Sequence, residues 1–129
     1  RYRHADRVDA ILTLGSPHCE HRGTGTGWYL GDAANQLAPG APHCDTIAYR
    51  AIGGRAVQGR IAGSPREQFA YRTYRALGGH GDVWGDGTVP VPCTRLNGAE
   101  NVTLEGVGHS LRYGHWYLSS PHVIRRWWA

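Results

Sequence analysis

Two glycine-rich turns contain the residues whose types and spacing point most directly to chemistry. Asp86 lies in the segment Gly85-Asp86-Gly87-Thr88-Val89-Pro90, and His109 lies in the segment Gly106-Val107-Gly108-His109-Ser110. A carboxylate beside an imidazole fixes its tautomer and stabilises its charged form, so that the imidazole can remove a proton from a serine or cysteine nucleophile. The sequence therefore predicts that Asp86 and His109 are the acid and the base of a catalytic triad.

The nucleophile of that triad is missing from the pattern. In triads whose members follow the chain order nucleophile, acid, histidine, the nucleophile lies upstream of the acid on a Gly-x-Ser-x-Gly turn. Residues 1–129 contain no such pentapeptide. Ser16 has no glycine two positions later, and Pro17 removes an amide that would form half of the oxyanion hole. Ser110 adjoins the base and is expected to point away from its ring. We therefore expect the nucleophile upstream of residue 1, in a longer parent protein.

Other roles also fit the two acidic residues of this region, Asp82 and Asp86. An aspartate in a Gly-Asp-Gly turn is commonly a turn former, because its side chain bonds to its own backbone. The pairing of Asp86 with His109 favours the catalytic role, and Asp82 is the second candidate for the acid. Residues 82–86 also resemble part of a calcium loop, but too few alternating oxygen ligands follow.

Short apolar runs predict the strands that would position these residues. Residues 8–14 form a nearly continuous apolar run that ends at Gly15-Ser16-Pro17, which is typical of a buried parallel strand. Residues 47–52 predict a second strand that ends at Gly53-Gly54, with residues 56–59 extending it past a bulge. Residues 101–105 alternate polar and apolar side chains and predict the last strand, whose following turn contains His109.

Helix signals alternate with these strands. Ser64-Pro65-Arg66-Glu67 is a capping box that predicts a helix to about Leu77, with a buried stripe of Phe69, Thr73, Ala76 and Leu77. A last helix is expected from Ser120-Pro121, with an apolar face of Val123, Ile124, Trp127 and Trp128. Residues 2–7 would be the tail of an earlier helix, and residues 19–46 an irregular loop region on the substrate side. The alternation predicts one α/β domain with a parallel sheet and flanking helices.

Composition describes an ordinary globular chain. Its 129 residues are 40% hydrophobic and 19% charged, with a formal net charge of +4. All basic residues are arginines, but they are scattered and no nucleic-acid-reading motif is present, so no nucleic-acid partner is expected. The sequence contains no signal peptide, no transmembrane run and no methionine, which favours a fragment or a processed piece. Cellular location stays open, with a slight preference for the cytoplasm.

Three cysteines, Cys19, Cys44 and Cys93, show no Cys-x-x-Cys spacing. The groups His18-Cys19-x-His21 and His43-Cys44-Asp45 match no common zinc site, so neither a metal nor a cofactor is expected. Three free thiols are the default prediction, and a Cys19–Cys44 disulfide is the alternative.

Several motifs, in this order, support a family resemblance over nearly the whole chain: Leu14-Gly15-Ser16-Pro17-His18, Trp84-Gly85-Asp86-Gly87-Thr88-Val89-Pro90, Leu96-Asn97-Gly98-Ala99-Glu100-Asn101, Leu104-Glu105-Gly106-Val107-Gly108-His109-Ser110 and Trp116-Tyr117. Together they resemble the C-terminal half of lipase-like serine α/β-hydrolases, most closely the bacterial and plastid lipase-like group. Similarity to bacterial triacylglycerol lipases, and to inositol-deacylase and lecithin–cholesterol acyltransferase relatives, is weaker.

The resemblance implies a function for the parent protein. Asp86 stands at the position of the triad acid and His109 at that of the general base, while the elbow strand and its serine would precede residue 1. The implied activity is hydrolysis of a carboxylic ester of a lipid or another small acyl compound, with peripheral lipid contact, or acyl transfer by the same triad. Residues 19–46, including Trp28 and Tyr29, and also Trp116 would line the acyl site.

A different class of function is also open. A non-catalytic α/β fragment could dock on a partner, because the strand at residues 8–14 would have an unpaired edge that another chain can satisfy. The oligomeric state is not predicted by the sequence.

Overall fold

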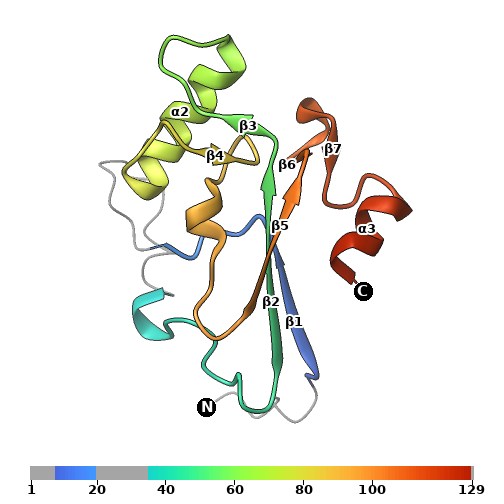
Figure 1. Cartoon of the computed structure of the whole chain (residues 1–129). Helices are drawn as coiled ribbons and strands as arrows, with labels where there is room; N and C mark the ends of the chain where they lie inside the picture. Colours follow the sequence, from blue (N-terminus) through green and yellow to red (C-terminus); the bar gives the residue numbers. More distant parts are fainter. Residues whose placement is uncertain (1–7, 20–34, 129) are drawn as a thin grey trace.

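A three-stranded parallel sheet forms the centre of the molecule. The computed structural model describes residues 8–19 and 35–128. The strand order is β1 (Ala10–Leu14), β2 (Ala48–Arg55) and β5 (Glu100–Glu105), with β2 in the middle (Figure 1). Two pairs of residues that lie opposite each other in the register form exposed ion pairs across β2 and β5: Arg50 with Glu100, and Arg55 with Glu105. The predicted parallel sheet and α/β class are confirmed.

The middle strand is longer than predicted. We expected Gly53-Gly54 to end it, but β2 continues through both glycines to Arg55. A Cβ atom at Gly53 would collide with the Thr94 side chain, and one at Gly54 would collide with the Val107 carbonyl oxygen. The two glycines therefore let neighbouring backbone lie directly against the sheet instead of ending the strand.

A second, smaller sheet carries the chain toward the acid turn. β3 (Val57–Gln58) pairs antiparallel with β4 (Trp84–Gly85), so residues 56–59 leave the parallel sheet and do not extend it past a bulge as predicted. Between these strands lies helix α2 (Pro65–Gly78), which begins with the predicted capping box of Ser64 and Glu67 and ends at Gly79 with a φ of 81°.

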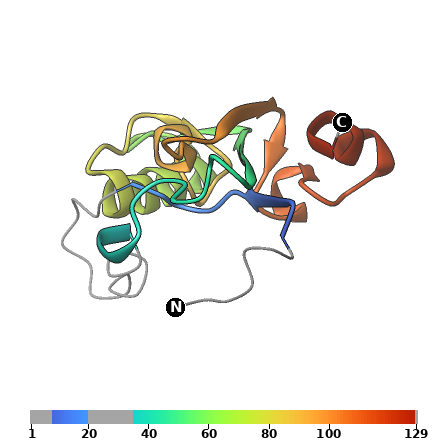
Figure 2. The same ribbon diagram turned by 90° about the horizontal axis from the view of Figure 1, so that it is seen from below.

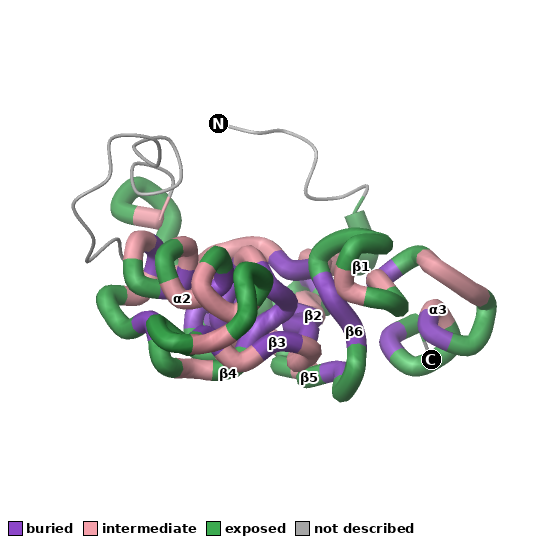
Figure 3. The backbone as a smooth tube through the Cα atoms, turned by 90° about the horizontal axis from the view of Figure 1, so that it is seen from above, coloured by how far each residue is buried: buried purple, intermediate pink, exposed green. Residues whose placement is uncertain are grey.

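The buried face of α2 differs from the prediction. Ala70, Tyr74 and Leu77 are buried, whereas Phe69 is 47% exposed and the other expected stripe residues except Leu77 are only half-buried. The cause is Tyr74, whose hydroxyl reaches buried backbone on both β3 and the acid turn. Figure 3 shows buried residues concentrated where β2 and β3 run beside this helix.

The last part of the chain turns back toward the sheet. The 3₁₀ helix η2 (Val91–Thr94) precedes β5, and short strands β6 (Val107–Gly108) and β7 (His115–Trp116) flank the 3₁₀ helix η3 (Leu111–Tyr113). Helix α3 (Pro121–Trp128) starts where predicted and buries Val123 and Trp127, although Trp128 is 68% exposed. Figures 1 and 2 show α2 and α3 on opposite sides of the sheet.

The cysteine prediction was wrong. Cys19 and Cys93 form a disulfide, and Cys44 is an exposed free thiol. The backbone N–H of His18 donates to the carbonyl of Cys93, so the segment after β1 and η2 lie against each other. The disulfide joins residues 74 positions apart in the sequence, which no local spacing signals.

Two predicted segments fall largely outside the described residues. The helix tail at residues 2–7 does, and of the loop region 19–46 only Cys19 and residues 35–46 are described, with residues 35–37 helical. Within the part of the chain that the structure covers, no helix is long and apolar enough to span a membrane.

Candidate functional site

The turn after β4 fixes the side chain of Asp86. The Asp86 N–H donates to the Val89 carbonyl at 3.1 Å, and Gly87 takes a φ of 98°, which favours glycine. The N–H groups of Thr88 and Val89 donate to Oδ1 of Asp86 at 2.9 and 2.7 Å. The turn therefore satisfies one carboxylate oxygen completely and leaves Oδ2 to face another element.

That other element is the segment containing His109. Glu105 ends β5, Gly106 turns the chain with a φ of 72°, and β6 then leads into His109. The His109 N–H donates to the Asp86 backbone carbonyl at 2.8 Å, and its Nδ1 lies 2.9 Å from Oδ2 of Asp86. The structure thus brings together the two residues that the sequence selected, through both backbone and side chains.

Burial and charge define the chemistry of this pair. Asp86 is fully buried, whereas the side chain of His109 is 41% exposed. An ionised carboxylate only accepts hydrogen bonds, so Nδ1 carries the proton and Nε2 is the basic nitrogen. The hydrogen bond to Asp86 raises the pKa of His109, partial burial opposes this rise, and the negative charge of Asp86 adds to it. The arrangement suits a base that takes a proton at Nε2.

Two tyrosines complete the surroundings of Asp86, and the sequence assigned a role to neither. The Tyr117 hydroxyl donates to Oδ2 of Asp86 at 2.9 Å. The Tyr74 hydroxyl donates to the Val57 carbonyl at 3.1 Å and accepts from the Gly87 N–H at 2.7 Å. For Tyr117, the sequence signal was its place in the Trp116-Tyr117 motif of the resemblance. No sequence signal pointed to Tyr74.

The pair lies beyond the carboxyl ends of β1 and β5. Gly15 follows β1 directly, and a Cβ atom there would lie 2.8 Å from Oδ2 of Asp86. Gly106 follows β5 and leads to His109. In open parallel sheets, ligands bind outside the carboxyl ends of the strands, so this is the edge at which a site is expected.

The other candidates lie elsewhere or lack a partner at this pair. Asp82, the second candidate for the acid, is exposed, and so is Ser110. Ser16 and Trp116 are half-buried, and Trp28 and Tyr29 lie outside the described residues. Among residues 8–19 and 35–128, no hydroxyl or thiol group hydrogen-bonds to Nε2 of His109. The described residues therefore bring Asp86 and His109 together without a nucleophile at Nε2.

The remaining histidines do not gather at a common centre. His18 approaches the Thr13 hydroxyl at 3.1 Å, and burial lowers its pKa. Four others are exposed: His43, His80, His115 and His122. Within the described segments, no three His, Cys, Asp or Glu side chains are grouped so that they could hold a metal ion.

No family model, no curated protein and no solved structure matches this chain.

Proposed function

We propose that this chain is the C-terminal portion of a serine α/β-hydrolase that cleaves carboxylic esters of lipids or other small acyl compounds. One observation carries the proposal: Nδ1 of His109 lies 2.9 Å from the fully buried Asp86 carboxylate, which leaves Nε2 as the basic nitrogen. A purely structural ion pair does not require one ring nitrogen to be held by the carboxylate while the other stays free. Nucleophilic catalysis by a serine does require this, because the free nitrogen must take the serine proton.

The proposed reaction follows from this geometry. A serine of the parent protein attacks the acyl carbon of the ester while Nε2 of His109 takes its proton. His109 returns that proton to the departing alcohol, and Asp86 stabilises the imidazolium in between. Water then adds to the acyl-enzyme with His109 again as base, which releases the acid and frees the serine. With an alcohol in place of water, the same steps give acyl transfer.

The serine and the oxyanion donors belong, in this proposal, to the part of the parent that precedes Arg1. The free side of β1 is where they fit, because β1 pairs only with β2 among the described strands. A parallel strand added there would end beside Gly15, which contacts the Asp86–Tyr117 cluster. Side chains that follow neighbouring parallel strands meet at the same edge of the sheet.

The test is hydrolysis of p-nitrophenyl butyrate and octanoate by the protein extended upstream in its native reading frame. Turnover is expected, and Asp86→Asn and His109→Ala should each lower kcat by several orders of magnitude, because triad members act as a unit. The matched control variants are Asp82→Asn and His115→Ala, which change exposed residues and should retain turnover.

Two results would sink the hydrolase proposal. One is an extended, folded protein that turns over neither ester. The other is turnover that survives both Asp86→Asn and His109→Ala at the level of the control variants.

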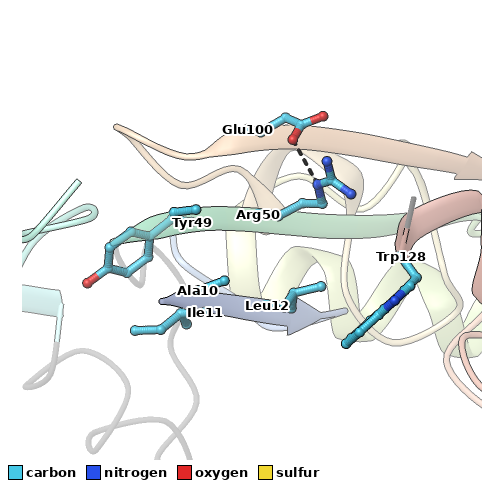
Figure 4. A pocket seen from close by; sticks show the side chains of 8 residues that line it. Ala10, Ile11, Leu12, Tyr49, Arg50, Glu100 and Trp128 are labelled. Carbon is cyan, nitrogen blue, oxygen red and sulfur yellow. Dashed lines mark hydrogen bonds and ion pairs between the residues drawn. The ribbon is translucent and has the colours of Figure 1, made fainter. Parts of the chain in front are cut away.

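Docking on a partner polypeptide is a second candidate function, favoured by the same free edge. Beside it lies a hollow of about 280 Å³ over the starts of the three parallel strands, lined by Ala10, Ile11, Leu12, Ala48, Tyr49, Arg50, Glu100 and Trp128 (Figure 4). The free edge of β1 next to this hollow can accept a strand from another chain, and a second copy is the partner proposed. Sedimentation should then show dimers that Ile11→Lys abolishes; a monomer at every concentration contradicts it.

A further inference from the structure

Tyr117 lies beside His109 because of strand register. β6 and β7 pair in parallel, with Val107 opposite His115 and Gly108 opposite Trp116. His109 and Tyr117 directly follow these two strands, so they leave the pair at the same level. The indole Nε1 of Trp127 donates to the Tyr117 carbonyl at 2.9 Å and anchors this backbone to α3.

The side chains of Tyr117 and His109 share one oxygen atom. Oδ2 of Asp86 lies 2.9 Å from the Tyr117 hydroxyl and 2.9 Å from Nδ1 of His109, while Oδ1 accepts only backbone N–H groups. Each carboxylate oxygen therefore has two donors. Of these four donors, Tyr117 is the only side chain besides the histidine itself.

The Tyr117 hydroxyl is tightly enclosed. The residue is 4% exposed, and Cβ atoms at Gly15 and Gly54 would approach its hydroxyl to 2.8 and 3.0 Å. Two glycines at the carboxyl ends of β1 and β2 thus leave just enough room for this oxygen. Such enclosure restrains the hydroxyl to the position from which it reaches Asp86.

The environment also keeps this hydroxyl protonated. Burial raises the pKa of Tyr117 well above its usual value, and the negative charge of Asp86 and the hydrogen bond to it raise it further. A phenol that stays protonated is a permanent donor to the carboxylate.

We propose that Tyr117 is a positioning residue for the Asp86–His109 pair: its hydroxyl holds Oδ2 of Asp86 in place and takes a share of that oxygen's negative charge. The role rests on the proposed function, in which His109 is the base. Tyr117 acts through Asp86, so it tunes the base without touching substrate. Removing the hydroxyl concentrates the carboxylate charge on the imidazole, which makes His109 hold its proton more strongly.

The test is an NMR titration of the histidines in the isotope-labelled full chain, in wild type and in Tyr117→Phe. The His109 signals are assigned with His109→Gln. One hydrogen bond to a charged acceptor is lost, so the pKa of His109 should rise by about half to one pH unit. Tyr113→Phe is the matched control, because the Tyr113 hydroxyl meets only the Gly87 carbonyl, at 3.4 Å. A folded Tyr117→Phe protein with an unshifted or lowered His109 pKa overturns the proposal.

A second substitution guards against a Phe variant that does not fold. 3-Fluorotyrosine at position 117 keeps the size and the hydrogen bond but is a stronger donor, so it should lower the pKa of His109. An unchanged titration in this folded protein also overturns the proposal.

The titration does not depend on turnover, which separates it from the hydrolase test. In an active extended protein, the Tyr117→Phe substitution should move the acidic limb of the kcat/KM–pH profile to higher pH, in step with the raised pKa of His109. Shifted titrations in an extended protein without esterase activity would sink the hydrolase function and leave the link between Tyr117 and His109 standing.

Discussion

Asp86 performs two tasks with its two oxygen atoms. Oδ1 closes the turn through the N–H groups of Thr88 and Val89, and Oδ2 meets His109 and Tyr117. The turn-forming role and the proposed catalytic role, which compete when the sequence alone is considered, are therefore compatible in one side chain. The turn aims the carboxylate, and the aimed carboxylate orients the imidazole.

The interaction between Asp86 and His109 predicts a dependence of stability on pH. The hydrogen bond to Asp86 raises the folded-state pKa of His109 above the usual value for histidine, so protonation of this residue favours the folded state. Its contribution is fully present below the unfolded pKa and is lost as pH rises through the folded pKa. His109→Gln should therefore destabilise the protein more at about pH 5.5 than at about pH 9.

Urea unfolding of both proteins at the two pH values measures this effect. His115→Gln, which changes the exposed histidine of β7, is the matched control. A difference between wild type and His109→Gln that is equal at both pH values, or larger at the alkaline one, would contradict the assigned direction.

At the scale of elements, α2 supports the acid turn through a single side chain. Tyr74 is fully buried, and its hydroxyl joins the Val57 carbonyl of β3 to the Gly87 N–H of the turn. Tyr74→Phe keeps the ring but leaves both backbone groups buried without this partner. We expect a loss of about 1 to 3 kcal/mol in the free energy of unfolding, measured by urea denaturation.

Tyr71→Phe is the control for this prediction, because Tyr71 is a half-buried tyrosine of the same helix. Equal stability of Tyr74→Phe and wild type would show that α2 does not support the turn through this hydroxyl.

Signals local in the sequence predicted α2, α3 and the three strands of the parallel sheet, whereas the short strands β4, β6 and β7 and the contacts between distant segments were not predicted. The Ser64 capping box and the Pro121 helix start depend on neighbouring residues, so both were found. The Asp86–His109 pair was found because each residue sits in a recognisable glycine-rich turn. Gly54 was misread as a strand end, since its meaning lies in its approach to Val107, and Tyr117 contacts Asp86 through a register between strands that no spacing encodes.

At the scale of the whole molecule, the disulfide joins the segment after β1 to η2, which precedes β5. Cys19 follows β1 and Cys93 lies in η2, and the bridge closes a loop of 74 positions that includes β2 and α2. Cys93 also packs with Leu77 of α2 and Val89 of the acid turn. The bridge thus restrains the elements that hold Asp86.

Reduction of this bridge should lower the stability of the whole fold. A cross-link over a loop of this length restricts the unfolded chain and typically contributes about 2 to 5 kcal/mol. We therefore expect dithiothreitol, or the double substitution Cys19→Ala and Cys93→Ala, to lower the urea midpoint to the same extent. Cys44→Ser removes the exposed thiol and should keep the full response to reductant. If the Cys44→Ser protein no longer responds to reductant, or if the double variant unfolds at the same midpoint as wild type, Cys19 and Cys93 are not the stabilising bridge.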